Sequence, residues 1–534
     1  MIQGSDTSKS ASLSGGACLV VGIVLAAVAE AVAGGVLSLG RADIMGDTYA
    51  TPDELAWLDV SYIAMKFAGF MLAPWLLGRL NARTAMVVTT LVMGAGCAAA
   101  AVTTRLDVLV AVRALQGLSG GLLLVGGQVI LFQSFSKARQ PVIQALFALG
   151  AVVAPATLAP TLQGWLIDSQ SWGWIFLAVV PVTLAAAGLM LMADGADQRA
   201  ADARSFDAPG LLLIGTCLFC LTYVLSQGQR WDWFQAPHIV WLSVLGGAGL
   251  AWFIVQQVRA GARGLMDFSA FRIDDFAFAF IVSFVAGAAL FGSAWLIPSF
   301  AVSVLGFTPT SAGLLLLPGG AVFIGALLLA AFLMQVRRMP PIAAAPLGIL
   351  TLMAAMWMLS RSTHESSAGD MMTALLLRGG GLGFLFLSIT LVAFSALDGR
   401  ALAAGISLFN TGRQLGGLMG VAALQTLIGR ETAANHAALG ANIAPGAPAV
   451  SERIAGVADV LVARGMDAAL AARAAPALLA RTVAGQSSVI AFETAFSAVA
   501  LLFVVAAPLV ISVKIGLARL SRRRAALRGQ GSAI

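Results

Sequence analysis

Charged residues are scarce in this chain. Asp, Glu, Lys and Arg make up 11% of its 534 residues, whereas hydrophobic residues make up 59%. A soluble domain carries roughly 25% charged residues, and a water-soluble fold of this size could not cover so much apolar surface. The shortage of charge therefore excludes a water-soluble protein and predicts a membrane protein.

Cysteine and histidine are also rare. The four cysteines, Cys18, Cys97, Cys217 and Cys220, lie in apolar runs, which excludes a disulfide framework. The three histidines are far apart in the sequence, and no segment shows the spacing of metal ligands or a nucleophile beside a base. We therefore expect no metal, no cofactor and no enzymatic activity.

Long apolar runs are what the sequence has instead. A helix needs about 20 apolar residues to cross a bilayer, and counting such runs predicts an all-α integral membrane protein with 14 transmembrane helices. The predicted spans are residues 16–40, 55–77, 85–103, 108–133, 142–166, 174–193, 208–226, 237–257, 276–302, 311–334, 342–360, 371–395, 401–428 and 488–513.

Lys and Arg are unevenly distributed between these spans. With the N-terminus inside, the cytoplasmic segments hold 19 of them and the short outer loops hold 4, as the positive-inside rule requires. Both termini are therefore predicted to be cytoplasmic, and the net charge of +7 reports topology rather than a nucleic-acid partner.

A weak internal repeat suggests how the spans are grouped. Arg113 and Arg378 each lie near the outer end of a helix and each precede a Gly-containing stretch. Repeated halves are typical of transporters, whose site lies near the middle of the membrane. The predicted parts are a cytoplasmic tail (1–15), a six-helix half (16–193), two inserted helices (208–257), a second six-helix half (276–513) with a periplasmic loop (429–487), and a basic cytoplasmic tail (514–534) that is a candidate contact for anionic lipid.

Ionisable residues inside the spans are costly and usually face a partner or a cavity. At about 1.5 Å per residue, Glu30 and Lys66 lie about 15 and 16 Å from the outer ends of their helices. We predict that they pair, either as a fixed structural ion pair or with Glu30 taking up and releasing a proton. Asp59 shares the helix face of Lys66. Arg378 and Glu493 lie nearer the outer interface, where snorkelling or a loop contact is expected.

Two further arginines lie inside predicted spans. Arg113, with Gln116 one turn away, requires a carboxylate, carbonyl, water or substrate as a partner, because a guanidinium stays charged. Arg413 follows Asn410 by one turn and is expected either to contact substrate or to lock against another helix.

The span 142–166 contains Pro155 and Pro160, which interrupt helical hydrogen bonding, and Gly150 and Gly164, which permit close approach. This pattern predicts a bent helix. It is either an ordinary kink or a hinge or sealed interface between the two halves.

Four motifs together resemble one family. They are Arg113-Ala-Leu-Gln-Gly117, Ala159-Pro160-Thr-Leu-Gln-Gly164, Trp172-Gly-Trp-Ile-Phe176 and Asn410-Thr-Gly-Arg413. The chain resembles the major facilitator superfamily and, within it, the fourteen-helix EmrB/QacA-type drug:proton antiporters.

The sequence departs from the family pattern at two places. Glu30 stands where the family usually has Asp. The loop between the second and third spans retains Arg79 and Arg83 but lacks the aspartate and two glycines of the family motif. In the family that aspartate latches the halves in one state, and this chain lacks it.

The resemblance implies a proton-coupled exporter in a bacterial inner membrane, which works by alternating access and is driven by the proton gradient. Glu30 would carry the proton, with Asp59 nearby and Arg113 tuning its surroundings. The path of a small amphipathic substrate would be lined by Lys66, Gln116, Asn410 and Arg413. Because Lys66 places a cation in an apolar cavity, we hypothesise an anionic substrate.

The likeness to EmrB also implies a periplasmic adaptor of the EmrA/HlyD type and a TolC-like outer-membrane channel, with the loop 429–487 as a candidate docking element. Two alternatives remain open. One is a proton-coupled exporter or symporter of one specific metabolite. The other is a non-transporting membrane sensor or scaffold, against which the titratable Glu30 argues.

Overall fold

The computed structural model describes residues 13–193, 207–260, 264–441, 443 and 447–531. Within these ranges the chain forms helices and no strand. The predicted tail 1–15 lies almost wholly outside the described residues, as do Lys9, Arg199, Arg204 and Arg263 among the basic residues used for orientation.

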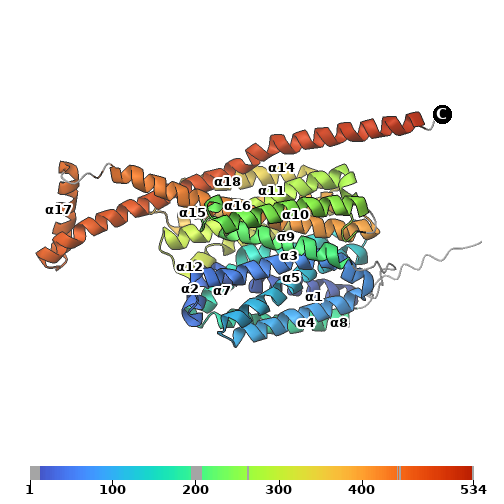
Figure 1. The fold of residues 1–534 in the computed structure, drawn as a ribbon, viewed down its shortest axis with the longest axis horizontal. Helices are drawn as coiled ribbons and strands as arrows, with labels where there is room; N and C mark the ends of the chain where they lie inside the picture. Colours follow the sequence, from blue (N-terminus) through green and yellow to red (C-terminus); the bar gives the residue numbers. More distant parts are fainter. Residues whose placement is uncertain (1–12, 194–206, 261–263, 442, 444–446, 532–534) are drawn as a thin grey trace, which may run out of the picture.

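The helices run side by side along one direction (Figure 1). The N-terminal bundle comprises α1 (Leu13–Gly34), α2 (Arg41–Thr48), α3 (Pro52–Arg79), α4 (Ala82–Ala101), α5 (Leu106–Ser134), α6 (Gln140–Ala148), η3 (Leu149–Leu158), α7 (Ala159–Ser169) and α8 (Gly173–Met192). Next come α9 (Ala208–Gln227) and α10 (Pro237–Ala260). The C-terminal bundle comprises α11 (Asp274–Ser303), α12 (Pro309–Leu314), α13 (Leu317–Gln335), α14 (Ala345–Leu359), α15 (Ala368–Phe394), α16 (Gly399–Ala441), α17 (Pro448–Ala463) and α18 (Ala468–Gly531).

Polar residues at the helix starts explain where the long helices begin. Thr51 and Glu54 form a capping box at the start of α3, and Ser367 and Asp370 form another at the start of α15. Each pair satisfies backbone N–H groups that have no partner within the helix. The side chain of Asn81 caps α4 more simply, by accepting a hydrogen bond from the Arg83 amide. The helix boundaries are therefore set locally, by short polar segments between apolar runs.

Thirteen helices of the described residues are long and apolar enough to cross a membrane. The prediction gave fourteen, and the span 401–428 is the one that does not reach this threshold. It lies within α16, which is 43 residues long but carries Asn410, Arg413 and Gln414 close together. These polar groups lower the apolar character of the segment without interrupting the helix.

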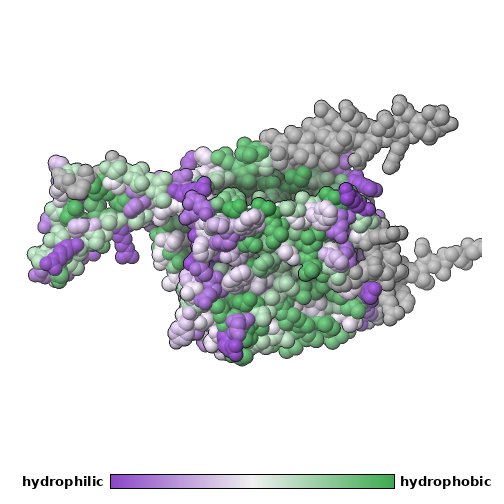
Figure 2. Space-filling model, viewed as in Figure 1, coloured by the Kyte–Doolittle hydropathy of each residue, from purple (hydrophilic) through white to green (hydrophobic). Residues whose placement is uncertain are grey.

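The surface agrees with a membrane-embedded body. Hydrophobic side chains form a broad band over the body, and hydrophilic side chains gather towards its two ends (Figure 2). α10 is largely exposed, with Trp241 and Trp252 among its outward-facing side chains. α9 packs against α10 and also against α3 and α16, so this pair of helices lies on the outside of the contact between the two bundles.

The predicted bent span 142–166 is helical but not uniformly α-helical. It consists of α6, a π-helical stretch (Leu149–Leu158) that contains Pro155, and α7, in which Pro160 lies in the first turn. A π-helical stretch relaxes the usual hydrogen-bonding pattern where proline removes a donor.

The predicted loop 429–487 is largely helical. α16 and α18 both continue beyond the body, and α17 crosses between them at the far end (Figure 1). We refer to this projection, residues 429–487, as the arm. The C-terminal end of α18 and the start of α1 lie at the opposite end of the body from the arm (Figure 1).

Candidate functional site

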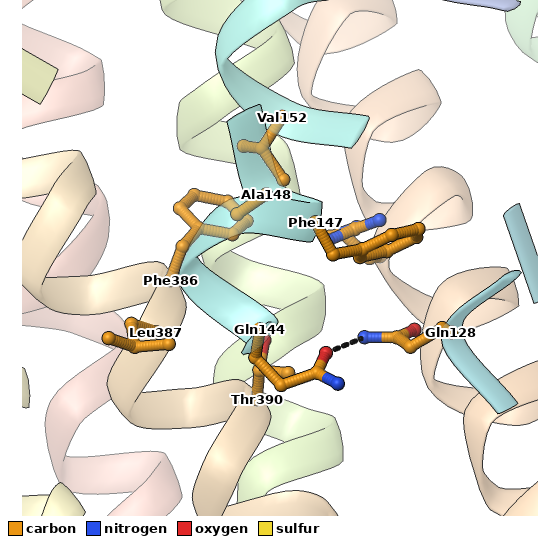
Figure 3. Close-up of a pocket in the computed structure, with 9 residues that line it drawn as sticks. Gln128, Gln144, Phe147, Ala148, Val152, Phe386, Leu387 and Thr390 are labelled. Atoms are coloured by element: carbon orange, nitrogen blue, oxygen red, sulfur yellow. Dashed lines mark hydrogen bonds between the residues drawn. The ribbon is translucent and has the colours of Figure 1, made fainter. Parts of the chain in front are cut away.

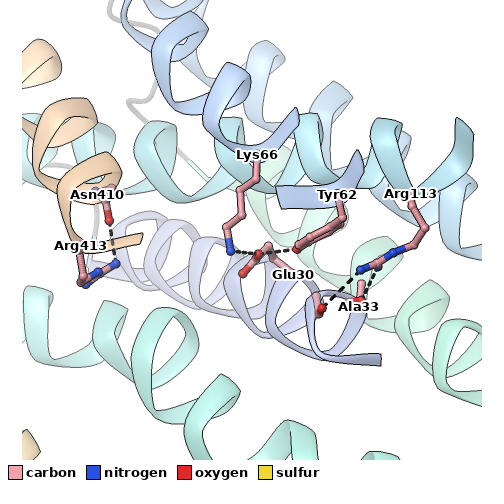
Figure 4. Close-up of polar contacts among 8 residues, drawn as sticks. Glu30, Ala33, Tyr62, Lys66, Arg113, Asn410 and Arg413 are labelled. Carbon is pink, nitrogen blue, oxygen red and sulfur yellow. Dashed lines mark hydrogen bonds and ion pairs between the residues drawn. The ribbon is translucent and has the colours of Figure 1, made fainter. Parts of the chain in front are cut away.

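A buried carboxylate lies at the centre of the N-terminal bundle. Glu30 comes from α1, and its Oε1 atom lies 2.5 Å from the ammonium Nζ of Lys66 on α3. The hydroxyl of Tyr62, one turn earlier on α3, donates a hydrogen bond to the same oxygen at 2.6 Å. Only 4% of the Glu30 side chain and 11% of the Lys66 side chain are exposed. The predicted Glu30–Lys66 pair is therefore present, with Tyr62 as a third member (Figure 4).

Two glycines leave the space that this cluster occupies. A Cβ on Gly120 of α5 would stand 2.8 Å from Cγ of Glu30, and a Cβ on Gly34 of α1 would stand 2.7 Å from the hydroxyl of Tyr62. Any larger residue at either position would push the carboxylate and the phenol apart. The close approach of α1, α3 and α5 at this level therefore depends on the absence of a side chain.

Arg113 lies on the other side of Tyr62. Its guanidinium donates to the backbone carbonyls of Ala33 at 2.7 Å and Gly34 at 3.4 Å, at the end of α1. It also donates to Oε1 of Gln116 at 3.1 Å, and it lies 4.0 Å from the centre of the Tyr62 ring. Of the partners that the sequence allowed, the structure gives Arg113 carbonyls, an amide and an aromatic face rather than a carboxylate.

Arg413 belongs to a second polar group, which joins the two bundles. Its guanidinium donates to Asn410 Oδ1 at 2.7 Å, and the Asn410 amide donates to Gln128 of α5 at 3.0 Å. Gln128 in turn donates to Gln144 of α6 at 3.3 Å. Arg413 and Asn410 on α16 are thus tied by buried amides to helices of the N-terminal bundle.

A small cavity of about 10 Å³ lies beside this amide group (Figure 3). A space of that size holds about one water molecule. The cavity combines two aromatic side chains with amide, hydroxyl and guanidinium groups, and its polar and aromatic lining residues are Gln128, Gln144, Phe147, Phe386, Thr390 and Arg413.

The charge of Arg413 is not neutralised by any carboxylate among the described residues within ion-pair distance. Its polar partner is the neutral Asn410, and the ring of Phe386 lies 5.8 Å away. The residue is only 9% exposed. A buried guanidinium with neutral partners gains strongly from a nearby anion.

The two bundles touch on both sides of these groups. On the side of the arm, the Asp168 carboxylate of α7 accepts a hydrogen bond from the Thr310 amide of α12 at 2.9 Å, and a Cβ on Gly164 would stand 2.5 Å from the Pro309 carbonyl. On the opposite side, the rings of Phe132 and Phe394 meet edge to face, with centres 5.4 Å apart. A molecule can therefore reach these polar groups from either side only if contacts between the two bundles separate.

An exposed ion pair accompanies the aromatic contact on that second side. Lys137, between α5 and α6, lies 3.3 Å from Asp398, between α15 and α16. At the end of α3, the guanidinium of Arg79 lies 5.4 Å from the centre of the Trp75 ring, and at the start of α4 the Arg83 amide donates to the capping Asn81.

Several candidate residues lie apart from the carboxylate. Asp59 is partly exposed and pairs with Arg41 at 3.1 Å rather than with Lys66. Gln116 is fully buried between Arg113 and Cys97, away from the cavity at Arg413. Gly150 faces α1, since its Cβ would stand 2.6 Å from the Val24 carbonyl.

The expectation that Arg378 snorkels is wrong. The residue is only 3% exposed, and its Nε donates to the Ser293 hydroxyl of α11 at 2.9 Å. Its position along α15 had suggested an interfacial location, but the side chain points into the bundle. Glu493 is partly buried within α18.

Sequence reasoning missed Tyr62, Gln128 and Gln144. The prediction rests on charged residues and on recognised motifs, and these three side chains are neither charged nor part of such a motif. The available signal was position: Tyr62 falls on α3 between Asp59 and Lys66, within one turn of each.

A family model described as Major Facilitator Superfamily matches residues 19–421. The Multidrug export protein EmrB of Escherichia coli K12 is 25% identical over 408 residues, which cover 75% of this chain and 78% of that protein. The Fatty acid resistance protein FarB of Neisseria gonorrhoeae is 26% identical over 454 residues, covering 85% and 82%. A Multidrug resistance protein B homolog of Mycobacterium tuberculosis is 26% identical over 407 residues, covering 76% and 75%.

Proposed function

The chain belongs to the major facilitator superfamily, as its motifs predicted, and from this membership we propose that it is a proton-coupled exporter of small amphipathic compounds. In this proposal it is a transporter of the bacterial inner membrane, works by alternating access and takes its energy from the proton gradient. The observation that carries the proposal is the buried Glu30–Lys66 pair, which lies between two separable layers of contact.

Glu30 is the proposed proton carrier. When it is ionised, Lys66 neutralises it and Tyr62 donates to it. When it takes up a proton, the ammonium of Lys66 loses its counter-ion and must find water or another anion. Protonation therefore changes the electrostatics at the middle of the bundle, which is what coupling to a conformational change requires.

The proposed substrate site is the cavity at Arg413. A guanidinium binds carboxylate and similar anionic groups well, and the rings of Phe147 and Phe386 provide an apolar surface beside it. This combination suits an amphipathic compound with one anionic group. The name of the FarB relative, a fatty acid resistance protein, is consistent with such a substrate. Because the cavity holds about one water, the bundles must separate before a substrate binds.

The two halves and their topology also form part of the proposal. Arg113 of α5 reaches carbonyls of α1, and Arg378 of α15 reaches Ser293 of α11. In each bundle a buried arginine thus connects corresponding helices, which supports halves at 16–193 and 276–513 with inserted helices at 208–257. The fourteenth span is α16, and the end of the molecule opposite the arm is the cytoplasmic one.

The arm is the proposed docking element for a periplasmic adaptor of the EmrA/HlyD type, which would connect to a TolC-like channel. It projects away from the body (Figure 1). Val460 on α17 and Leu470 and Leu478 on α18 are exposed at 52%, 58% and 39%. Exposed apolar side chains on a projecting helical element are typical of a protein-binding surface.

The test is transport into proteoliposomes under an imposed pH gradient, with acidic and cationic amphipathic compounds compared side by side. Glu30→Gln should abolish gradient-driven transport, whereas Glu365→Gln, which changes an exposed glutamate in the same way, should leave it intact. Full gradient-driven transport by the Glu30→Gln variant would refute the role of Glu30 as proton carrier.

A further inference from the structure

Tyr62 contacts two functional groups with different parts of its side chain. Its hydroxyl donates to Oε1 of Glu30 at 2.6 Å, and its ring lies 4.0 Å from the guanidinium carbon of Arg113. The residue is 3% exposed. A buried phenol usually needs one hydrogen-bond partner, but here that partner is the proposed proton carrier.

The hydroxyl shares its acceptor with Lys66. Both the Tyr62 hydroxyl and the Lys66 ammonium reach Oε1 of Glu30, at 2.6 and 2.5 Å. Figure 4 shows the carboxylate between them. A proton that reaches this oxygen along the Tyr62 hydrogen bond would therefore remove the acceptor that holds Lys66.

The outer end of the same helix face carries a further carboxylate. Asp59 precedes Tyr62 by three residues on α3, so it lies one turn nearer the end where α3 begins. Its side chain is 28% exposed and is held by Arg41. The order along α3 is thus a partly exposed acid, a buried phenol that donates to Glu30, and the lysine that neutralises Glu30.

We propose that Tyr62 relays protons from the side of Asp59 to Glu30 and positions the carboxylate to receive them. The inference rests on the proposed function, in which Glu30 carries the proton. A hydronium ion near Asp59 gives one proton to the Tyr62 oxygen as the phenol passes its own proton to Oε1 of Glu30. The hydronium becomes water, Tyr62 is neutral before and after, and Glu30 gains one proton.

Neighbouring residues hold the phenol in the orientation that this transfer needs. The Arg113 guanidinium lies over the ring and attracts its electrons. This contact holds the ring in a fixed position. Gly34 leaves the space around the hydroxyl, because a Cβ there would stand 2.7 Å from it. Donation by the hydroxyl to Glu30 is already in the direction of the proposed transfer.

The experiment separates proton transfer from substrate movement. Tyr62→Phe keeps the ring under Arg113 and removes only the hydroxyl. Each variant is assayed in proteoliposomes for uptake driven by a pH gradient and for exchange of labelled against unlabelled substrate at equal pH, which requires no net proton movement. Tyr62→Phe should lower gradient-driven uptake by about 100-fold, the size of a typical proton-transfer contribution, and leave exchange unchanged.

Matched variants identify the cause of any loss. Tyr223→Phe on α9 removes a hydroxyl outside the cluster and should change neither assay. Gly34→Ala, which crowds the hydroxyl, should lower driven uptake more than exchange. Undiminished driven uptake in Tyr62→Phe, or an equal loss of both activities in Tyr62→Phe and Gly34→Ala, would overturn the relay. Glu30→Gln keeps the two proposals distinct. If driven uptake survives in Glu30→Gln, Glu30 is not the proton carrier. If driven uptake is lost in Glu30→Gln but undiminished in Tyr62→Phe, only the Tyr62 relay is refuted.

Discussion

Removal of Lys66 alone should destabilise the protein more than removal of both members of the buried pair. In Lys66→Met the new side chain has nearly the same shape as lysine but carries no charge. Tyr62 is then the remaining donor to Glu30 from this cluster. Glu30→Gln leaves the ammonium without its carboxylate. The double variant leaves neither charge, so it restores electrostatic balance while it keeps most of the side-chain volume.

The magnitude follows from the burial of the pair. Breaking a buried ion pair by removal of one partner costs about 3–5 kcal/mol, whereas replacement of both partners is often neutral or stabilising. The loss of stability in a single variant corresponds to a fall of about 3–5 °C in Tm. This follows from an unfolding entropy of about 2 cal/mol/K per residue and a chain of 534 residues. The exposed Lys137–Asp398 pair, with side chains 78% and 77% exposed, is a matched control. Its disruption should cost at most about 1 kcal/mol.

The assay is thermal unfolding of the purified variants in one detergent, at pH 8 and at pH 5. Lys66→Met should recover part of its loss at pH 5, because a protonated carboxyl needs no counter-ion. The double variant should unfold at a higher temperature than either single variant. If Lys66→Met is as stable as the parent protein, or if the two single losses simply add in the double variant, the pair is not an energetic unit and the reasoning is refuted.

Three further predictions concern the substrate site, the bundle contact and the arm. Arg413→Gln should lower transport of acidic amphipathic compounds about tenfold, the equivalent of about 1.4 kcal/mol, and Arg413→Lys should lower it less. An equal loss for cationic compounds in proteoliposomes would contradict an anion site. Gly164→Leu should arrest transport by wedging α7 from α12, whereas Gly188→Leu, at a position with nothing within 4 Å, should be tolerated in the same assay. Replacement of residues 434–482 by a short Gly-Ser linker should lower efflux from whole cells but spare transport in vesicles, and a loss in vesicles would mean that the arm serves transport itself.

The Glu30–Lys66 contact could be predicted because it depends on quantities that a sequence contains. The helical rise is constant, and consecutive spans start from opposite membrane surfaces, so depth follows from residue counting. Facing direction does not follow in the same way. The prediction that Arg378 snorkels or contacts a loop was wrong because the packing of α15 against α11 directs its side chain to Ser293.

The amide group at Arg413 could not be predicted for a different reason. Gln128 and Gln144 carry no charge, so their insertion is less costly and they do not stand out in an apolar run. Their importance arises from contacts between residues that are distant in sequence, such as Asn410 with Gln128. Asn410 and Arg413, by contrast, are three residues apart on one helix, so their contact is a local feature of the sequence.

The arrangement of charge also constrains how proton and substrate can be exchanged. One buried carboxylate, Glu30, interacts electrostatically with three cationic side chains. It forms an ion pair with Lys66 and a longer-range interaction with Arg113 and Arg413. An anion at Arg413 and a proton on Glu30 have opposite charges, so Coulomb attraction favours binding both together, which would carry them in the same direction. Exchange in opposite directions therefore cannot arise from direct competition at Glu30. In the proposed mechanism, it requires that the contacts on the two sides of the cavity open to substrate only in the state in which Glu30 is ionised.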